Sequence, residues 1–443
     1  MANSRKSSLT DLAGRIEAAL PSGSSILLGL SGGVDSVVLL HLLHGFAPRY
    51  SWKLAALHVH HGISQYADDW AKFCADSCAR LEIPFCVRKI DIAPLRAQGV
   101  EAAARQLRYA AFAEHPCDYV VLAHHRDDQV ETLLLQLLRG AGVKGAGAMP
   151  EISADSTKHK IVRPLLHYTR EEVVEYARAH ELQWIEDESN ADDGYPRNFL
   201  RHRLLPLLSE KFPAYRTTLS RSAEHFAEAG ELLDDLAGMD GAHAISGGTL
   251  SVAALQGLSV ARAKNLLRYF LHQMKAPMPQ AVRLDEMLHQ LLAARGDADV
   301  RIDFGGWQIR RFRKRAYALR MQAEFDPDFV LRWQGEPQLG WPAMDTAVNF
   351  LQSTGQGVNL AKLERSPVTL KLRRGGETLR PGSKSATRRL KNLFQEHGIP
   401  PWQRDRLPLL YCGEDLVCVP GIAIAAEYLC KEGEAGMSVE MDR

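Results

Sequence analysis

The sequence predicts an α/β protein with a doubly wound parallel sheet, followed by a mainly helical domain and a small α+β C-terminal domain. Two observations carry this prediction. Up to about residue 190, short apolar runs alternate with helical patterns, which is typical of a parallel sheet covered by helices. From Tyr215 to about Ala294 the pattern is helical, and short strands return from about Ala361 to the end.

The elements of the first region are apolar runs bounded by polar or glycine-rich turns. The predicted strands are Ile26–Leu30, Lys53–Val59, Phe85–Ile90, Tyr119–Ala123 and Ile161–Leu165. The predicted helices are Val37–Leu43, Ala67–Leu81, Val100–Ala113, Asp128–Arg139 and Arg170–His180. Ligands of such sheets bind at the carboxyl ends of the strands, so motifs that directly follow a strand are the first candidates for a site.

The second half is predicted to begin with helices, of which Ser259–Met274 and Pro279–Ala294 are the clearest. Arg301–Arg320 predicts a hairpin that turns at Gly305-Gly306, because two glycines permit a primed turn. Phe325–Gly357 is rich in Pro, Gly and Gln, which indicates a linker or irregular connection. The predicted domains are a catalytic domain at 1–214, a helical substrate-binding domain with the basic hairpin at 215–322, the connection at 323–360 and a basic domain at 361–443.

The composition is that of an ordinary globular protein, with 46% hydrophobic and 24% charged residues. No apolar run approaches the roughly 20 residues that span a membrane, and the first residues do not form an apolar signal core. We therefore expect a cytoplasmic protein with no membrane partner. The seven cysteines include no C-x-x-C pair, and Cys74 and Cys78 are four apart on a predicted helix. Core packing is thus favoured over a zinc site or a disulfide framework.

Positive charge is concentrated in two stretches, although the net charge is only +1. Arg301–Arg315 carries a local balance of +5 and Lys371–Arg406 one of +7, which leaves −11 for the remainder. This distribution predicts that a polyanion binds the C-terminal half; the alternative is a solvated helix face in the predicted basic helix Ser385–His397. The candidate contacts are Arg310, Arg311, Arg313, Arg388, Arg389 and Lys391.

The strongest local signal is SGGVDS, which lies between the first predicted strand and helix. Two glycines allow a tight turn close to an anion, and the helix N-terminus directs N–H groups at it. No lysine follows, so the loop is not a Walker A loop. The alternative is an ordinary strand–turn–helix that binds no anion. The candidate nucleotide-binding residues are Ser31, Gly32, Gly33, Val34, Asp35 and Ser36, with Asp35 able to hold Mg²⁺ on the phosphates.

Histidines follow the second strand. Alternation along a strand places His58 and His60 on one face, followed by His61. No cysteine is nearby, so lining of the nucleotide pocket is favoured over metal ligation.

Two helices carry charged residues on one face. Glu101, Arg105 and Arg108 are spaced by four and three, which fits either a solvent-facing ion pair or arginines that reach phosphate. Asp128 and Glu131 are three apart at the start of another helix. They fit a cationic substrate group, Mg²⁺, or ordinary acids of a first helical turn.

Arg197, Arg201 and His202 can share one face of a helix predicted to end before Pro206. This face is either a solvated basic surface or a charge clamp beside the nucleotide site.

SGGVDS resembles the pyrophosphate (PP) loop of the N-type ATP pyrophosphatases, which cleave ATP between the α- and β-phosphates. With the other motifs, nearly the whole chain resembles the long three-domain form of the tRNA(Ile)-lysidine synthetase family. The matching motifs are HVHHGIS at 58–64, EAAARQLRY at 101–109, HHRDDQVET at 124–132, WIEDESNADD at 184–193, RNFLR at 197–201, KNLFQE at 391–396, PPW at 400–402 and LPL at 407–409.

The resemblance implies a ligase that modifies the wobble cytidine of an isoleucine tRNA with a CAU anticodon. The carbonyl oxygen at carbon 2 attacks the α-phosphate of ATP, and free L-lysine then attacks carbon 2 and releases AMP. It further implies ATP and Mg²⁺ at the SGGVDS loop and lysine at Asp128 and Glu131. Arg105, Arg108 and Arg201 would stabilise phosphate charge, and one carboxylate would take the amine proton. The oligomeric state stays open, with a homodimer as one option.

Three rivals remain. A tRNA thiolation enzyme of the same superfamily needs a reactive cysteine, and no C-x-x-C is present. A small-molecule ligase, such as an NAD or arginine-pathway synthetase, leaves the two basic stretches without a role. A non-catalytic tRNA-binding protein is disfavoured by the intact loop.

Overall fold

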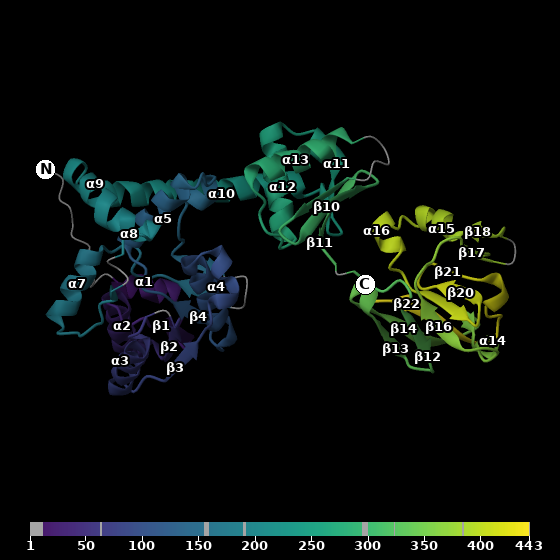
Figure 1. Cartoon of the computed structure of the whole chain (residues 1–443), viewed down its shortest axis with the longest axis horizontal. Coiled ribbons are helices and arrows are strands. Elements are labelled where there is room, and N and C mark those ends of the chain that lie inside the picture. Colours follow the sequence, from purple (N-terminus) through teal and green to yellow (C-terminus); the bar gives the residue numbers. More distant parts are fainter. Residues whose placement is uncertain are drawn as a thin grey trace. The chain divides into compact units, whose positions relative to one another are not determined.

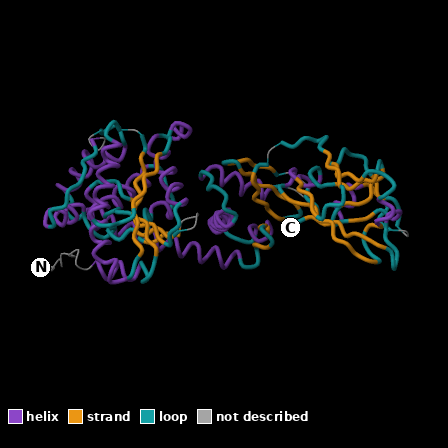
Figure 2. The backbone as a smooth tube through the Cα atoms, turned by 90° about the horizontal axis from the view of Figure 1, so that it is seen from below, coloured by secondary structure: helices purple, strands orange, loops and turns teal. Residues whose placement is uncertain are grey.

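The computed structural model describes residues 12–62, 64–154, 159–188, 192–294, 300–322, 324–382 and 385–442. The chain divides into two compact units, residues 1–237 and 238–443. Strands dominate the C-terminal half of the chain, whereas the strands of the first unit are surrounded by helices (Figure 2).

The first unit contains the predicted parallel sheet, with strand order β3-β2-β1-β4-β6-β5 (Figure 1). All neighbours pair in parallel except β5, an antiparallel edge strand that the sequence did not predict. The strands are β1 Ser25–Gly29, β2 Lys53–His60, β3 Phe85–Lys89, β4 Tyr119–Val121, β5 Ile152–Ala154 and β6 Lys160–Val162. The chain leaves β1 toward β2 and β3 on one side and reaches β4 on the other. The loops after β1 and β4 therefore meet at the switch point of the sheet, where such folds bind ligands.

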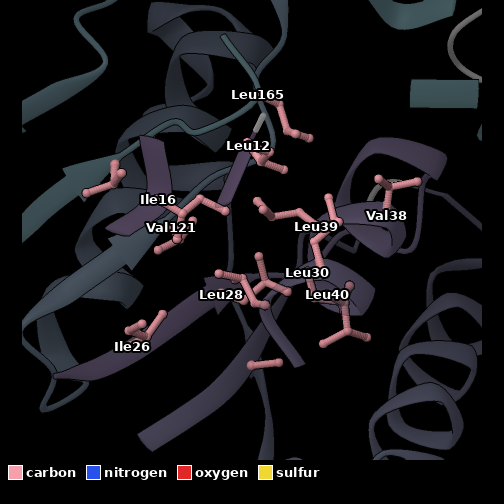
Figure 3. Close-up of a cluster of buried hydrophobic side chains, with 14 of the residues drawn as sticks. Leu12, Ile16, Ile26, Leu28, Leu30, Val38, Leu39, Leu40, Val121 and Leu165 are labelled. Atoms are coloured by element: carbon pink, nitrogen blue, oxygen red, sulfur yellow. The ribbon is translucent and has the colours of Figure 1, made fainter. Parts of the chain in front are cut away.

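Both faces of this sheet are covered, as alternation along β1 shows. Ile26 and Leu28 pack with α1, α2, α3 and α7, whereas Leu27 packs with α4 on the other face. Figure 3 shows Ile26, Leu28 and Leu30 beside Leu39 and other apolar side chains. The helices are α1 Leu12–Ala19, α2 Val34–Tyr50, α3 Ala67–Arg80, α4 Val100–Glu114, α5 Arg126–Leu138, α6 Val143–Ala146, α7 Arg170–Ala179, α8 Pro196–Phe199 and α9 Leu205–Lys211.

The predicted end of a helix before Pro206 is wrong. A π-helical turn, Leu200–Leu204, connects α8 to α9, and Pro206 lies in the first turn of α9. Proline is tolerated there because the first turn has no intrahelical partner for its missing N–H. The helical run therefore continues from Pro196 to Lys211.

The second unit begins with helices packed on a five-stranded sheet of order β7-β8-β11-β10-β9. Gly305 and Gly306 both have positive φ and connect β9 to β10, as predicted. The chain then turns again at Arg313-Lys314, so the expected hairpin is a three-stranded meander. The elements are α10 Tyr215–Gly241, which begins in the first unit, β7 Ile245–Ser246, β8 Thr249–Ser251, α11 Val252–Gln256, α12 Val260–Gln273, α13 Ala281–Ala293, β9 Arg301–Phe304, β10 Trp307–Phe312 and β11 Arg315–Arg320.

The stretch expected to be an irregular connection is folded. It contains strands of two antiparallel sheets, of order β12-β16-β19-β20-β21 and β13-β14-β22-β15. Its Pro and Gly residues lie between strands, except for Gly340 in β13, and Val348–Thr354 of β14 pairs with the last strand, β22. These strands are β12 Val330–Trp333, β13 Gln338–Trp341, β14 Thr346–Thr354, β15 Val358–Asn359, β16 Val368–Lys371, β19 Leu409–Cys412, β20 Asp415–Val419, β21 Ala423–Ile424 and β22 Ala435–Met441.

The predicted basic helix Ser385–His397 is also shorter than expected. Arg388 and Arg389 form strand β18, which pairs with β17 Thr378–Leu379, and the helix α15 is Leu390–Glu396. Leu390, Leu393 and Phe394 are buried, so packing of this face decides where the helix lies. The other short helices of this part are α14 Leu360–Leu363 and α16 Pro401–Arg404.

No helix of the described residues has the length and apolar character needed to cross a membrane.

Candidate active site

The SGGVDS loop follows β1 and leads into α2. Gly32 has φ +91°, and a Cβ at this position would lie 2.9 Å from Ile185 Cδ1, so a side chain is excluded both by conformation and by space. The Ser36 hydroxyl accepts a hydrogen bond from Gly32 N at 3.1 Å and donates one to Gly33 O at 2.9 Å. Ser36 therefore braces the loop, and the first turn of α2 opens beyond it.

Asp35 lies in the first turn of α2 and faces the loop that follows β4. Its Oδ1 is buried without a hydrogen-bond partner, and it lies 3.7 Å from His125 Nε2. Burial raises the pKa of the Asp35 carboxyl, and His125 partly offsets that effect. A buried carboxylate oxygen without a donor is suited to a cation that arrives with a ligand.

The loop after β4 ends at His125, which is the N-cap of α5. Asp128 N donates to His125 Nδ1 at 3.3 Å, and His125 N donates to Asp128 Oδ2 at 3.0 Å, so the two residues form a capping box. Asp127 accepts hydrogen bonds from Arg170 N at 2.9 Å and from the Arg216 guanidinium. The first turn of α5 is thereby fixed in position.

Asp128 and Glu131 lie on one face of α5 and bind two arginines of the segment that begins with α8. Arg197 Nε donates to Glu131 Oε2 at 2.6 Å, and its Nη2 donates to Asp128 Oδ1 at 2.9 Å. Arg201 donates to both oxygens of Glu131, at 2.8 and 3.0 Å. The Glu131 residue is only 1% exposed. Asp128 thus belongs to the capping box and binds Arg197 at the same time, so its place in the first helical turn is compatible with binding a cation.

Electrostatics favour the ionised forms of Asp128 and Arg201 in this cluster. Burial alone would raise the pKa of Asp128, but His125 and Arg197 hold it well below its usual range. For Arg201, burial acts against the charged form, and the hydrogen bond from its guanidinium to Glu131 outweighs it and raises the pKa. Four charges with short, direct hydrogen bonds therefore replace water at this edge of the sheet.

A cavity of about 700 Å³ opens beside Glu131 and Arg201. Its lining contains both signs of charge, with Asp127, Glu171 and Glu175 alongside Arg170, Arg178 and Arg216.

The histidines after β2 and β4 are mostly buried. His58 Nδ1 lies 2.9 Å from Leu30 O, and His60 Nε2 lies 3.2 Å from Asp68 Oδ1. Burial lowers the pKa of His124 to about 3 and that of His61 to about 4. Both imidazoles are therefore neutral near pH 7. No three His, Cys, Asp or Glu side chains within the described residues are arranged to hold a metal ion.

The two arginines of α4 lie in different surroundings. Arg108 Nη2 is 3.4 Å from His61 Nε2 and partly buried. Arg105 is exposed, and its guanidinium lies over the Tyr109 ring at 5.1 Å. The side chain of Glu101, considered as an ion-pair partner for Arg105, lies outside the described residues.

The sequence did not identify Arg197 or His125 as individual site residues. Arg197 was grouped with a basic helix face that also contained His202, but His202 bonds Asp193 instead, with Nδ1 2.7 Å from Oδ1. Histidine is an unusual N-cap, and an acid three residues later is the signal that indicates a capping box.

Cys74 and Cys78, the two cysteines of α3, are unsuited to sulfur chemistry beside this site. Cys74 and Cys78 are fully buried, as predicted for core residues. Burial raises the pKa of the Cys74 thiol to about 12 and that of Cys78 to about 11, which keeps both in the unreactive thiol form.

Several of the predicted polyanion contacts have structural partners. Arg311 donates to Leu291 O and Ala294 O at the end of α13, so it caps that helix. Arg313 donates to Gln395 O, and Arg388 binds Glu396 at 2.7 Å. The prediction that Arg388, Arg389 and Lys391 lie in one helix is wrong, because only Lys391 is in α15.

The remaining candidates face solvent or an aromatic ring. Arg389 and Lys391 are exposed, and Arg310 lies over the Trp402 ring at 5.1 Å.

Comparison with known proteins agrees with this architecture. Residues 6–208 match the PP-loop domain model, residues 250–317 the TilS substrate binding domain, and residues 368–441 the TilS substrate C-terminal domain. A solved structure, the U34-tRNA thiolase NcsA from Methanococcus maripaludis, covers 50% of this chain and 80% of its own at 19% identity. Its TM-score is 0.42, too low to bear on function.

Curated relatives match over nearly the full length. The chain is 42% identical to a tRNA(Ile)-lysidine synthase of Nitrosomonas europaea, over 99% of this chain and 97% of the relative. It is 42% identical to that of Azoarcus sp. (95% and 92% covered) and 36% identical to that of Coxiella burnetii (95% and 94% covered). The chain therefore belongs to the tRNA(Ile)-lysidine synthase family.

Proposed function

We propose that the carboxyl end of the first sheet is where ATP activates the wobble cytidine of tRNA(Ile) and where free L-lysine then attacks it. As a lysidine synthase family member, the chain is an ATP-using ligase that attaches lysine to this cytidine. The observation that carries the site assignment is the meeting of two loops at the switch point. Asp35 of the first loop lies 3.7 Å from His125, which caps the helix that carries Asp128 and Glu131.

ATP binds with its phosphates at the SGGVDS loop and the N-terminus of α2. The position of the loop supports this assignment, because it lies between β1 and the N-terminus of α2 at the switch point of the sheet. Asp35 fits Mg²⁺, since its buried Oδ1 has no donor and a divalent ion would satisfy it. Such an ion would neutralise phosphate charge as pyrophosphate leaves. His58 and His60 would line the nucleotide pocket beneath the loop.

Lysine binds with its ε-ammonium at Asp128 and Glu131. The adjoining cavity suits a free amino acid, because its arginines and carboxylates match the charges of an α-carboxylate and an α-ammonium. Asp128 is a weak base, since its pKa is far below the usual range, so it binds the ammonium and leaves proton acceptance to another group.

In the first step, the cytidine oxygen at carbon 2 attacks the α-phosphorus, and pyrophosphate departs. In the second step, the neutral ε-amine attacks carbon 2, and AMP departs with the oxygen. Arg105 and Arg108 would stabilise charge on the transferred phosphate, with Arg108 the better placed because it lies beside neutral His61. Arg201 would contribute less to phosphate binding, because both oxygens of Glu131 accept hydrogen bonds from its guanidinium.

The tRNA body binds the second unit through basic residues, chiefly the exposed Arg389 and Lys391 and the partly buried Arg310 over the Trp402 ring. Such contacts position a nucleic acid without reading its bases. The homodimer option stays a prediction.

The test is incubation of the purified protein with ATP, Mg²⁺, L-lysine and a CAU-anticodon tRNA(Ile) transcript, followed by nucleoside mass analysis. We expect lysidine, with AMP and pyrophosphate in equal amounts. A transcript with uridine at the wobble position is the matched control and should remain unmodified. Cytidine that remained unmodified in the first transcript, despite ATP turnover, would contradict the proposal.

A further inference from the structure

The guanidinium of Arg197 bridges the two carboxylates that we assign to the lysine ammonium. One of its N–H groups binds Glu131 at 2.6 Å and another binds Asp128 at 2.9 Å. A substrate ammonium that contacts both carboxylates would need the same position. Arg197 is thus a cation of the chain itself at the place where the cation of the substrate should bind.

The charge balance makes simultaneous binding unfavourable. Two carboxylates, Asp128 and Glu131, face two guanidinia, Arg197 and Arg201, so the cluster is neutral as it stands. A third cation would lose its hydration on entering the cluster. Because the cluster has no net charge, no net electrostatic attraction would offset that desolvation penalty. Acceptor capacity is limited too, because a carboxylate has about four lone-pair sites and Glu131 already accepts three hydrogen bonds.

Of the two arginines, Arg197 is the one whose position the ammonium needs, because its guanidinium donates hydrogen bonds to both carboxylates. Arg201 binds Glu131 through Nε and Nη2 in a fork, with one N–H on each oxygen, which is the stronger geometry. Arg197 makes one hydrogen bond to each of two carboxylates. Departure of Arg197 would leave two carboxylates and one guanidinium, a net charge of −1 that attracts an ammonium.

We propose that Arg197 is a resident competitor that occupies the lysine carboxylates until the substrate ammonium displaces it. This inference rests on the proposed function, because it takes Asp128 and Glu131 as the lysine site. A resident competitor lowers the apparent affinity for every amine by the fraction of molecules in which it is bound. Because this factor is the same for every amine, the competitor sets how much binding energy an amine must supply, and it leaves the ratio of affinities for lysine and shorter amino acids unchanged.

The test is the lysine KM of Arg197→Ala, measured at saturating ATP and tRNA. We expect the lysine KM to fall by about fivefold, with the ATP KM changed less than twofold, because the competitor is gone and the ATP loop is intact. The KM for ornithine should fall by the same factor, because the competitor acts on every amine alike. Guanidinium ion at low millimolar concentration should inhibit the variant competitively with lysine, since it can refill the vacated position, and should leave the wild type unaffected.

Arg203→Ala is the matched control. Arg203 follows two residues after Arg201, is 69% exposed and binds Asp193 away from the cluster. Its loss should leave the lysine KM unchanged. Arg197→Gln keeps a polar side chain without the charge and replaces the alanine variant if that does not fold; it should also lower the lysine KM.

A second measurement uses the wild-type protein alone. The NMR signal of the Arg197 Nε–H should shift on addition of lysine with a non-hydrolysable ATP analogue. A higher lysine KM in the Arg197 variants, a lack of competition by guanidinium, or an unmoved Nε–H signal would each overturn the proposal. These failures differ from failure of the proposed function, in which the wild type makes no lysidine or Glu131→Gln leaves the lysine KM unchanged.

Discussion

The two charged regions of the molecule use similar residues in opposite ways. At the carboxyl end of the first sheet, the side chains of Asp128 and Glu131 are 13% and 1% exposed and bind Arg197 and Arg201 directly. In the C-terminal basic stretch, the Arg388–Glu396 pair is 44% and 53% exposed. The two regions therefore differ in their degree of burial: the buried cluster can recognise one small cation, whereas the exposed surface can bind a polyanion.

The energetic consequence differs by several-fold. Removing one partner of a buried ion pair costs about 3–5 kcal/mol, because the other charge stays buried and unpaired. An exposed pair contributes about 0–1 kcal/mol. We therefore expect single substitutions at the sheet edge to have large and specific effects, and substitutions in the basic stretch to have small effects that add up.

The largest expected effect is at Asp35. Asp35→Ala should lower lysine-independent ATP–pyrophosphate turnover by about 10²-fold or more. The reason is that the metal ion that neutralises charge on the phosphates would lose its carboxylate ligand. The unfolding temperature should not fall, since burial already disfavours ionised Asp35. Asp69→Ala, an exposed acid of α3, is the control. Near-normal turnover would show that the buried carboxylate has no part in adenylation.

The next effect is at Glu131. Glu131→Gln should raise the lysine KM about 10²-fold, because the loss of a buried charge partner typically costs a few kcal/mol. The KM for ATP should change much less. Glu114→Gln removes an exposed partner of Arg88 and should leave both constants alone. A rise in the KM for ATP with lysine unaffected would instead assign the carboxylate to Mg²⁺.

A smaller effect concerns pH and the neutral imidazole of His124. Burial lowers its pKa to about 3 in the folded protein, whereas the unfolded chain binds a proton near pH 6.5. The unfolded state thus holds more protons between these values, so stability should fall as the pH drops from about 6.5. His124→Gln should reduce this slope by up to about 1.4 kcal/mol per pH unit, measured by urea unfolding from pH 7 to 4. An unchanged slope would mean that His124 is protonated when folded.

The smallest effect per residue is expected in the basic stretch. Arg389→Ala combined with Lys391→Ala should weaken tRNA binding and flatten the plot of log affinity against log salt by about 0.7–0.9 per lost contact. The ATP KM should stay constant. Arg365→Ala, an exposed arginine outside the basic stretch, is the control in filter-binding titrations. Equal slopes for the double variant and the wild type would show that Arg389 and Lys391 do not contact tRNA. The contacts would then be assigned to other residues, such as Arg310 beside Trp402.

Local sequence patterns predicted the structure correctly where neighbours in the sequence define the environment of a residue. The alternation of apolar runs and helices predicted the parallel sheet, and the glycine pair at 305–306 predicted its turn. Both signals depend on neighbours in sequence: the period of apolar residues and the φ that a turn demands. SGGVDS and the acids that open α5 were likewise placed correctly at the ends of β1 and β4, since parallel strands end at one edge.

Patterns failed where the partner is distant in sequence. The stretch from Phe325 to Gly357 has the composition of an irregular connection, yet its residues Val348–Thr354 form a strand because they pair with Ala435–Met441. In the sequence, Arg311 is one of several positive charges in a basic stretch. In the structure, its guanidinium caps the helix Ala281–Ala293.

The sequence by itself determined the family, the sheet and the residues that can carry chemistry, because these depend on residue type and local spacing. Only the tertiary structure decided which charges are buried together. Arg197 and Glu131 are 66 residues apart, and no local pattern predicts their 2.6 Å contact. It exists because the helical segment that begins at Pro196 brings its arginines over the face of α5 that carries both carboxylates, where the buried acids require cations.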